Sequence, residues 1–380
     1  MSARARVRHR ASWETRLLLL VTVFLVVFGL AAVYGASSIV ALQQGAPGSY
    51  YALRQLIGAT IGSAALILGA RYDYHTWQRY AWPILGVVAL ALLILLLPFA
   101  DPIVVELNGA RRWLGVPGLS FQPAEVAKFA VVAWTAMLAT KKGEGVRDLR
   151  QGILPFVVIL APVAALILFE PALSVALSVC LLAAIILFAA GARIGHFMIV
   201  GIVMIPFVWR QITTVQYRMQ RWLTFLSSGT DYAGSSWQIQ QSLIGMGAGR
   251  YFGVGFGQGM QKMGYLPYGY SDFIFSTIGE EWGFVGVAFM IALYAAFIGI
   301  GLRIARTAGD RFGSLLATGI TALIGVTAFV HIAVTLGVVP TTGLPLPFVS
   351  YGRSNLIVSM FATGVLINIG EHRSQPTKRR

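Results

Sequence analysis

The stretch RLLLLVTVFLVVFGLAAVYGAS, residues 16–37, carries one charged side chain in 22 positions. A helix needs about 20 predominantly apolar residues to cross the hydrocarbon core of a bilayer. The sequence therefore predicts an all-α polytopic membrane protein with about ten transmembrane helices. The nine further segments of mainly apolar residues are 50–70, 80–99, 121–140, 152–169, 171–191, 194–210, 273–301, 313–339 and 345–369.

The composition of the whole chain supports the membrane class. Hydrophobic residues make up 57% of the 380 positions and charged residues 11%, whereas soluble domains hold about 25% charged residues. The first apolar segment is too long, and its start too polar, for a cleaved signal peptide, so we expect a retained first helix. The single cysteine, Cys180, offers neither a disulfide within the chain nor a metal cluster.

The distribution of Lys and Arg predicts the orientation. Placing the N-terminus inside puts most of the 29 basic residues in inside segments, as the positive-inside rule requires. We expect one transmembrane domain over 16–370, flanked by basic cytoplasmic tails at 1–15 and 371–380. The net charge of +15 is then a signal of topology, and no nucleic-acid partner is expected.

The connections that fall outside are longer than the others. The largest spans about 210–272, between the seventh and eighth predicted helices, and such long loops are usually functional. Segments 100–120 and 338–347 fall on the same side, so we expect the function at this face, in a cavity between helices. The run GMGAGRYFGVGFGQG, 245–259, lacks the G-x-G-x-x-G spacing of a dinucleotide site and predicts a tightly turning loop instead.

Three carboxylates surround the start of the eighth predicted helix, in GYLPYGYSDFIFSTIGEEWGFVG, 264–286. Asp272 suits either a helix start that complements the helix dipole or a proton acceptor at the membrane edge. Glu280 and Glu281 lie deeper in the same segment, where carboxylates are costly unless they face protein or water. Packing against neighbouring helices and a role in a site both fit them.

Two more polar islands interrupt the apolar segments. In FQPAEVAK, 121–128, Glu125 and Lys128 are three positions apart and can face each other on a helix, as an ion pair or as a cavity wall. Arg111, Arg112 and Trp113 precede them and suit either a phosphate or interfacial anchoring.

The last island is PFVSYGRSN, 347–355, which we expect inside the tenth helix. Ser350, Tyr351 and Arg353 at that depth predict a cavity lining, because a lipid-facing Arg is costly. The three islands together predict a polar cavity with charges of both signs. Such a cavity suits an amphiphilic, anionic, lipid-linked substrate, for either catalysis or transport.

Five motifs, NGARRW, FQPAEVAK, QKMGYLP, SDFIFSTIGEE-GFVG and P-TTGLPLPFVSYG, resemble in their order the SEDS family of bacterial envelope proteins. This family comprises the FtsW, RodA and SpoVE groups, and the resemblance covers residues 16–370. The first and last motifs are more similar to the FtsW and SpoVE groups than to RodA.

The resemblance implies a peptidoglycan glycosyltransferase of the bacterial cytoplasmic (inner) membrane, most similar to the division group, which polymerises lipid II at the outer face. It also implies a class B penicillin-binding protein as partner, with other division or elongation proteins. The family's essential aspartate falls on Asp272, as the general base of an inverting transfer. A divalent cation is a further candidate for stabilising the pyrophosphate leaving group. The predicted substrate-binding residues are Arg112, Trp113, Glu125, Lys128, Arg218, Arg221, Lys262, Glu280, Ser350, Tyr351 and Arg353.

This chain departs from the family pattern at several positions. Ala124 replaces a serine, Tyr268 and Tyr270 replace a glutamate and a histidine before Asp272, and Arg353 stands where a glycine is usual. The alternatives left open are a lipid II flippase, a scaffold for the penicillin-binding protein and a RodA-type elongation polymerase.

Overall fold

The computed structural model describes residues 12–107, 110–116, 119–226 and 235–372. A helix lies in each of the ten predicted ranges, which confirms the all-α polytopic class. Seven helices of the described residues are long and apolar enough to cross a membrane, namely α1, α2, α6 with the turn before it, α8, α11, α12 and α13. The ten helices are α1 (Trp13–Gln43), α2 (Tyr50–Arg71), α4 (Ala81–Leu96), α5 (Pro123–Lys142), α6 (Leu154–Phe169), α7 (Leu173–Ala189), α8 (Ile194–Thr213), α11 (Ile274–Thr307), α12 (Arg311–Thr335) and α13 (Arg353–Glu371).

Shorter elements connect these helices. They are α3 (His75–Arg79), α9 (Gln216–Leu226), α10 (Ser235–Ala248), the 3₁₀ turns η1 (Pro98–Ile103), η2 (Gly143–Arg147) and η4 (Gln261–Met263), and the π turn η3 (Leu149–Ile153). The segment predicted as one long loop at about 210–272 therefore holds helix in much of its length, which corrects that expectation. Glycines at positive φ follow α10, at Gly253, Gly255 and Gly257, so the predicted tight turns are confirmed there.

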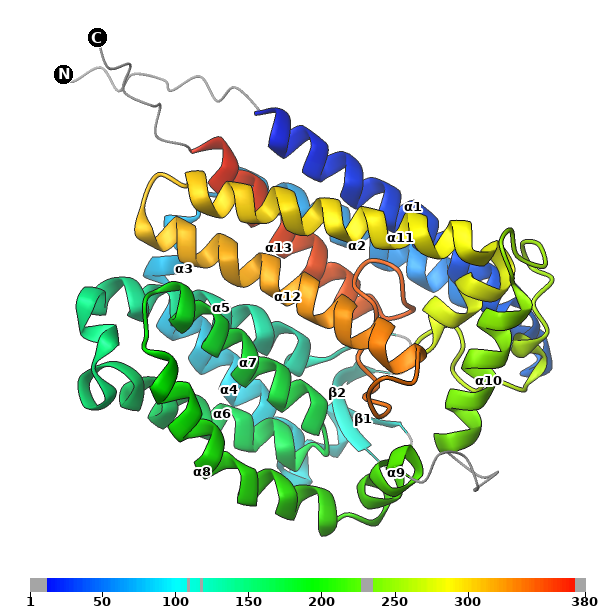
Figure 1. Ribbon diagram of the computed structural model, residues 1–380, viewed down its shortest axis with the longest axis horizontal. Helices are drawn as coiled ribbons and strands as arrows, with labels where there is room; N and C mark the ends of the chain where they lie inside the picture. The colour runs from blue at the N-terminus through cyan, green and yellow to red at the C-terminus, as the bar shows by residue number, and fades with distance from the viewer. Residues whose placement is uncertain (1–11, 108–109, 117–118, 227–234, 373–380) are drawn as a thin grey trace.

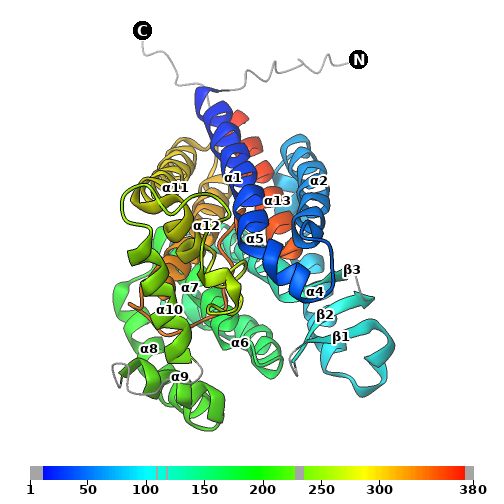
Figure 2. The same cartoon turned by 90° about the vertical axis from the view of Figure 1, so that its right-hand side faces the viewer.

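The bundle is organised around α5, which is buried along most of its length and packs against α4, α7, α12 and α13. The α11–α12 pair covers one side, and α1 lies between α11 and α2 (Figure 2). Glycines bring α2 and α13 together, since a Cβ at Gly364 would lie 2.1 Å from the carbonyl oxygen of Leu66. Small residues at such crossings permit the close helix contacts found in membrane bundles. Helix α8 runs along one side of the molecule (Figure 1) and contacts chiefly α9.

A small antiparallel sheet follows η1, where the sequence predicted no strands. Its strands are β1 (Val104–Leu107), β2 (Ala110–Val116) and β3 (Leu119–Phe121), in the order β1-β2-β3, with Val105 opposite Trp113. The sheet, α9, α10 and the chain before α13 gather at one end of the bundle, away from the end where α1 begins and α13 finishes (Figures 1 and 2). We call the end that carries the sheet, α9 and α10 the site end.

The last two predicted helices begin and end differently from the prediction. Helix α12 stops at Thr335, before Gly337 at a φ of +68°, and α13 begins only at Arg353. Pro345 and Pro347 lie in the intervening segment, and prolines lack the backbone donor that a helix needs. Ser350 and Tyr351 consequently precede the helix in which we expected them.

Candidate active site

Asp272 lies in the turn that leads into α11. The backbone N–H groups of Ser271 and Asp272 both donate to the carbonyl oxygen of Tyr268, at 3.0 Å, and Tyr268 adopts a φ of +58°. The half-buried Asp272 side chain faces the chain before α13, because a Cβ at Gly343 would lie 3.8 Å from its Oδ2. The turn thus presents this carboxylate to the region between α11 and α13.

Ser350 fixes this turn from the other side. Its hydroxyl donates to the carbonyl oxygen of Ser271 at 2.7 Å and accepts from the N–H of Leu346 at 2.8 Å. The N–H of Tyr351 donates to the carbonyl oxygen of Tyr270 at 3.0 Å. Two backbone segments that are 79 positions apart at Ser271 and Ser350 are therefore joined beside the aspartate.

Gln55 of α2 secures the same corner, although no sequence signal had marked it. Its Nε2 donates to the carbonyl oxygen of Ser350 at 3.0 Å, and its Oε1 accepts from the N–H of Gly352 at 3.1 Å. With 1% exposure, it satisfies the N–H of Gly352, which the start of α13 leaves open, and a carbonyl of the preceding turn.

The charges around Asp272 come from two arginines. Burial raises the pKa of the Asp272 carboxyl above its ordinary value, and the charges of Arg221 and Arg112, with a hydrogen bond from Ser271, act against that rise. Arg221, on α9, also donates to the carbonyl oxygen of Thr341 at 3.3 Å. A carboxyl whose pKa is raised by burial is a better proton acceptor than an exposed one.

Arg112 reaches the site end from β2. Its Nε donates to the carbonyl oxygen of Glu170 at 2.8 Å, and its Nη2 donates to that of Pro171 at 2.7 Å. Arg111 pairs instead with Asp101 at 2.7 Å, since adjacent residues of a strand point to opposite faces. The structure thus separates the two arginines. Trp113, also on β2, is half-buried.

Glu125 and Lys128 form the ion pair that their spacing predicted, with 2.8 Å between Oε2 and Nζ. Both side chains are buried, and Asn355 of α13 donates to the same Glu125 oxygen at 2.9 Å. The hydroxyl of Ser354 accepts from the N–H of Gln122 at 3.0 Å. These contacts hold the start of α5 against the start of α13.

Glu280 and Glu281 form a second cluster with Lys262. Glu280 Oε1 accepts from the N–H of Met260 at 2.7 Å, Glu281 Oε2 accepts from the N–H of Gly257 at 3.0 Å, and Lys262 pairs with Glu281 at 3.0 Å. Lys262 also donates to the carbonyl oxygen of Gly35 in α1. The structure therefore places Glu280 and Lys262 where they fasten the glycine-rich turn to α11 and α1.

Arg353 begins α13 and lies along α2, where a Cβ at Gly58 would be 3.0 Å from its Cγ. Burial raises the pKa of Tyr351, and the charges of Arg54 and Arg353 oppose this. The ring of Tyr351 makes contacts with those of Tyr51 and Tyr270, at centroid distances of 5.1 and 5.6 Å. Tyr270, one of the departures from the family pattern, thus joins an aromatic cluster beside the aspartate turn.

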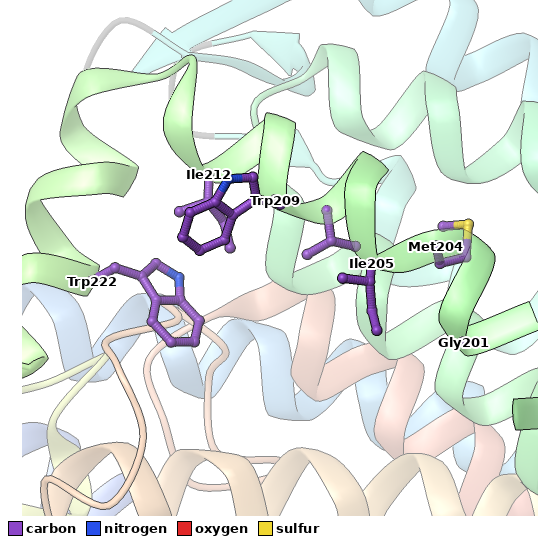
Figure 3. Close-up of a pocket in the computed structure, with 7 residues that line it drawn as sticks. Gly201, Met204, Ile205, Trp209, Ile212 and Trp222 are labelled. Carbon is purple, nitrogen blue, oxygen red and sulfur yellow. The ribbon is translucent and has the colours of Figure 1, made fainter.

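Helix α9 connects the charged region to an apolar one. Buried Arg218 donates to the backbone and side-chain oxygens of Gln211, both at 3.1 Å. Trp222 faces an apolar pocket of about 280 Å³ on α8, together with Trp209 (Figure 3). The remaining pocket residues are Gly201, Met204, Ile205, Val208 and Ile212.

The carboxylates offer little to a metal ion. Among the described residues, no three His, Cys, Asp or Glu side chains are grouped so that they could hold one. The described charges that act on Asp272 are arginines, which repel a cation. The described residues around Asp272 therefore form no cluster of protein ligands for a resident divalent cation.

Comparisons with known proteins agree with this architecture. Residues 15–375 match the family model of FtsW, RodA and SpoVE, described as cell cycle protein. The chain is 41% identical to a probable peptidoglycan glycosyltransferase FtsW of Trichlorobacter lovleyi, over 93% of this chain and 92% of that one. It is 34% identical to the stage V sporulation protein E of Bacillus subtilis, over 94% of this chain and 96% of that one.

Solved structures have the same fold. One chain, from a study of polymerization and crosslinking by a peptidoglycan synthase complex, is 26% identical with a TM-score of 0.75, over 95% of this chain and 98% of that one. The rod shape determining protein RodA of Thermus thermophilus is 23% identical with a TM-score of 0.68, over 94% and 97%. The family predicted from the five motifs is confirmed: the chain belongs to the FtsW/RodA/SpoVE family of multi-pass membrane cell cycle proteins.

Proposed function

We propose that this protein is a peptidoglycan glycosyltransferase that polymerises lipid II into glycan strands. The observation that carries the proposal is the setting of Asp272, a carboxyl held by two joined backbone segments beside the charges of Arg221 and Arg112. Relatives that are similar over nearly their whole length bear the name probable peptidoglycan glycosyltransferase.

Asp272 acts as the general base. The acceptor sugar hydroxyl must lose a proton as it attacks the anomeric carbon of the donor, and a positioned base contributes roughly 10²–10⁴-fold to such a step. An α-linked donor that gives a β-linked product inverts in a single displacement, so one carboxylate suffices for proton removal. Glu280 and Glu281 are already engaged with backbone N–H groups and Lys262.

The leaving group is a polyprenyl pyrophosphate, whose negative charge grows as the bond breaks. Arg221 and Arg112 supply the positive charge for it. The apolar pocket on α8 is lined in part by Trp222, the residue that follows Arg221, and it suits the polyprenyl chain. Tyr351, Tyr270 and Ser350 lie beside the aspartate turn. Together with Trp113 and Arg353 they make up the proposed sugar-binding surface.

The orientation follows from the charge distribution. We place the site end outside the bacterial cytoplasmic membrane and the basic tails inside, in accord with the positive-inside rule. The proposed partner is a class B penicillin-binding protein, which crosslinks the strands. Similarity to relatives named FtsW favours cell division over elongation.

The test is polymer synthesis by the purified complex with its penicillin-binding partner, whose transpeptidase site has been inactivated. Lipid II in detergent should give glycan polymer with the wild type and with Asp101→Asn, an exposed acid of the site end, but none with Asp272→Asn. Folding and partner binding are checked for each variant. A well-folded wild-type complex that makes no polymer contradicts the proposal and favours lipid II transport.

A further inference from the structure

Glu170 is a buried carboxyl that the proposed reaction leaves without a task. It follows the last residue of α6, is 1% exposed, and neither carboxyl oxygen has a hydrogen-bond partner among the described residues. An ionised carboxylate in such surroundings is costly unless it is paired, so the group holds a proton or gains a cationic partner.

Arg112 is the charged neighbour of Glu170. It donates to the backbone carbonyl oxygens of Glu170 and Pro171, and its charge acts on both the Glu170 and the Asp272 carboxyls. The charge of one guanidinium therefore acts on both the proposed base and a second carboxyl that no sequence motif had marked.

The other elements packed against α6 bring no competing charge to Glu170. Helices α4 and α7 contain no Asp, Glu, Lys, Arg or His. On α5, Glu125 and Lys128 pair with each other, and its two other lysines lie in its last turn. Arg150 of η3 lies at the opposite end of α6. The charge state of Glu170 is thus linked to Arg112.

We propose that Glu170 is a proton-dependent partner of Arg112. In its neutral form the carboxyl leaves the guanidinium charge to the diphosphate of the bound substrate, and in its ionised form it takes that charge for itself. The inference rests on the proposed function, because it names what controls Arg112, one of the two arginines proposed to bind the diphosphate. Glu170 would act through Arg112, as a positioning residue.

The expected pH range follows from burial, which raises the pKa of Glu170 to about 8 while Arg112 opposes the rise. Below that pH the carboxyl is neutral and diphosphate binding is strong. Above it the carboxylate pairs with Arg112, so the affinity for a diphosphate falls by about tenfold per pH unit at most. The kcat of bound substrate should change much less than KM.

The experiment measures the Kd of undecaprenyl pyrophosphate for the purified complex from about pH 6.5 to about pH 9.5. Binding should weaken above about pH 8 in the wild type. It should weaken in the same way in Glu106→Gln, which changes an exposed acid on β1. Glu170→Gln, which is isosteric and cannot ionise, should give a Kd that changes much less with pH. Arg112→Gln provides a second variant. It should bind weakly at every pH, and its Kd should change as little with pH as that of Glu170→Gln.

The outcomes separate the two proposals. A wild-type Kd that is flat over this range overturns the inference, and so does a Glu170→Gln profile that matches the wild type. If Glu170→Gln misfolds, a steep profile in Arg112→Gln overturns it instead. If the complex makes no polymer but its Kd still depends on Glu170, only the proposed polymerase activity is contradicted, because binding needs no turnover.

Discussion

Two groups of carboxylates stand within ten positions of each other, and the structure treats them in opposite ways. Glu280 and Glu281 accept hydrogen bonds from backbone N–H groups, and Glu281 also pairs with Lys262. Asp272 has a hydrogen bond with its neighbour Ser271 and otherwise the charges of Arg221 and Arg112. The first group is fully engaged, whereas the second retains the capacity to accept a proton.

The contrast teaches that partners, and not depth or sequence spacing, separate a structural carboxylate from a chemical one. The engaged pair immediately precedes the break in α11 at Gly283, whose φ is +64°. There the N–H groups of Val254 and Gly255 donate to the carbonyl oxygens of Glu280 and Glu281. The glycine-rich turn thus replaces helix hydrogen bonds, and mutations in the two regions should affect different quantities.

The largest expected loss of stability is that of Lys262→Met. It leaves the buried Glu281 carboxylate without its cationic partner, which costs about 3–5 kcal/mol in comparable pairs. Thermal unfolding in detergent measures this loss. Polymerisation per folded molecule should stay near the wild-type rate, and a rate loss of about 10²-fold with unchanged stability would instead place Lys262 in the chemistry.

Gly253→Ala should have the next largest effect. Gly253 adopts a φ of +83°, and a Cβ there would lie 2.2 Å from the carbonyl oxygen of Glu281. Strain of this kind costs about 1–3 kcal/mol, and the melting temperature should fall. The matched control is Gly86→Ala in α4, where a Cβ meets no atom within 4 Å. Equal melting temperatures for the two variants would refute the role of this turn.

Arg221→Gln sharpens the comparison from the side of Asp272. Because Arg221 holds down the raised pKa of Asp272, its removal should raise that pKa further. The base must be ionised to act, so the acid limb of the pH–rate profile should move to higher pH. Arg210→Gln, an exposed arginine of α8, is the control. A shift toward lower pH would contradict the assignment of the base.

Ser350→Ala should have the smallest effect on the rate among the variants aimed at Asp272. It removes the hydroxyl that joins Ser271 to Leu346 and leaves both backbone groups without that partner, at a cost of about 1–3 kcal/mol. The rate should fall modestly while the pH profile keeps its shape. Ser63→Ala, whose hydroxyl bonds within its own helix, controls for the loss of a serine. An unchanged rate in Ser350→Ala would show that the aspartate turn is held by its other contacts.

Sequence patterns predicted what depends on neighbours along the chain. Apolar runs located the helices, and the three-residue spacing of Glu125 and Lys128 predicted their contact, because both signals repeat within a few turns. Prolines 345 and 347 could have shown that α13 begins late. Helices α9 and α10 were missed because their apolar residues are interrupted by polar ones.

Contacts between distant segments could not be predicted in the same way. The register of Val105 with Trp113, the bonds of Gln55 to the start of α13, and those of Arg112 to the α6–α7 turn depend on how the helices pack. Glu170 gave no local signal other than a lone acid at the end of an apolar run. The roles of the predicted substrate-binding residues stay predictions.

The most direct measurement of the central claim is single-turnover transfer by Asp272→Asn with prebound lipid II, compared with the wild type. If Asp272 takes the proton, the variant binds lipid II with a similar Kd and reacts at least about 10²-fold more slowly, with an unchanged melting temperature. The claim would be contradicted if the variant reacted as fast as the wild type. It would also be contradicted if the difference in rate vanished once lipid II saturated the variant.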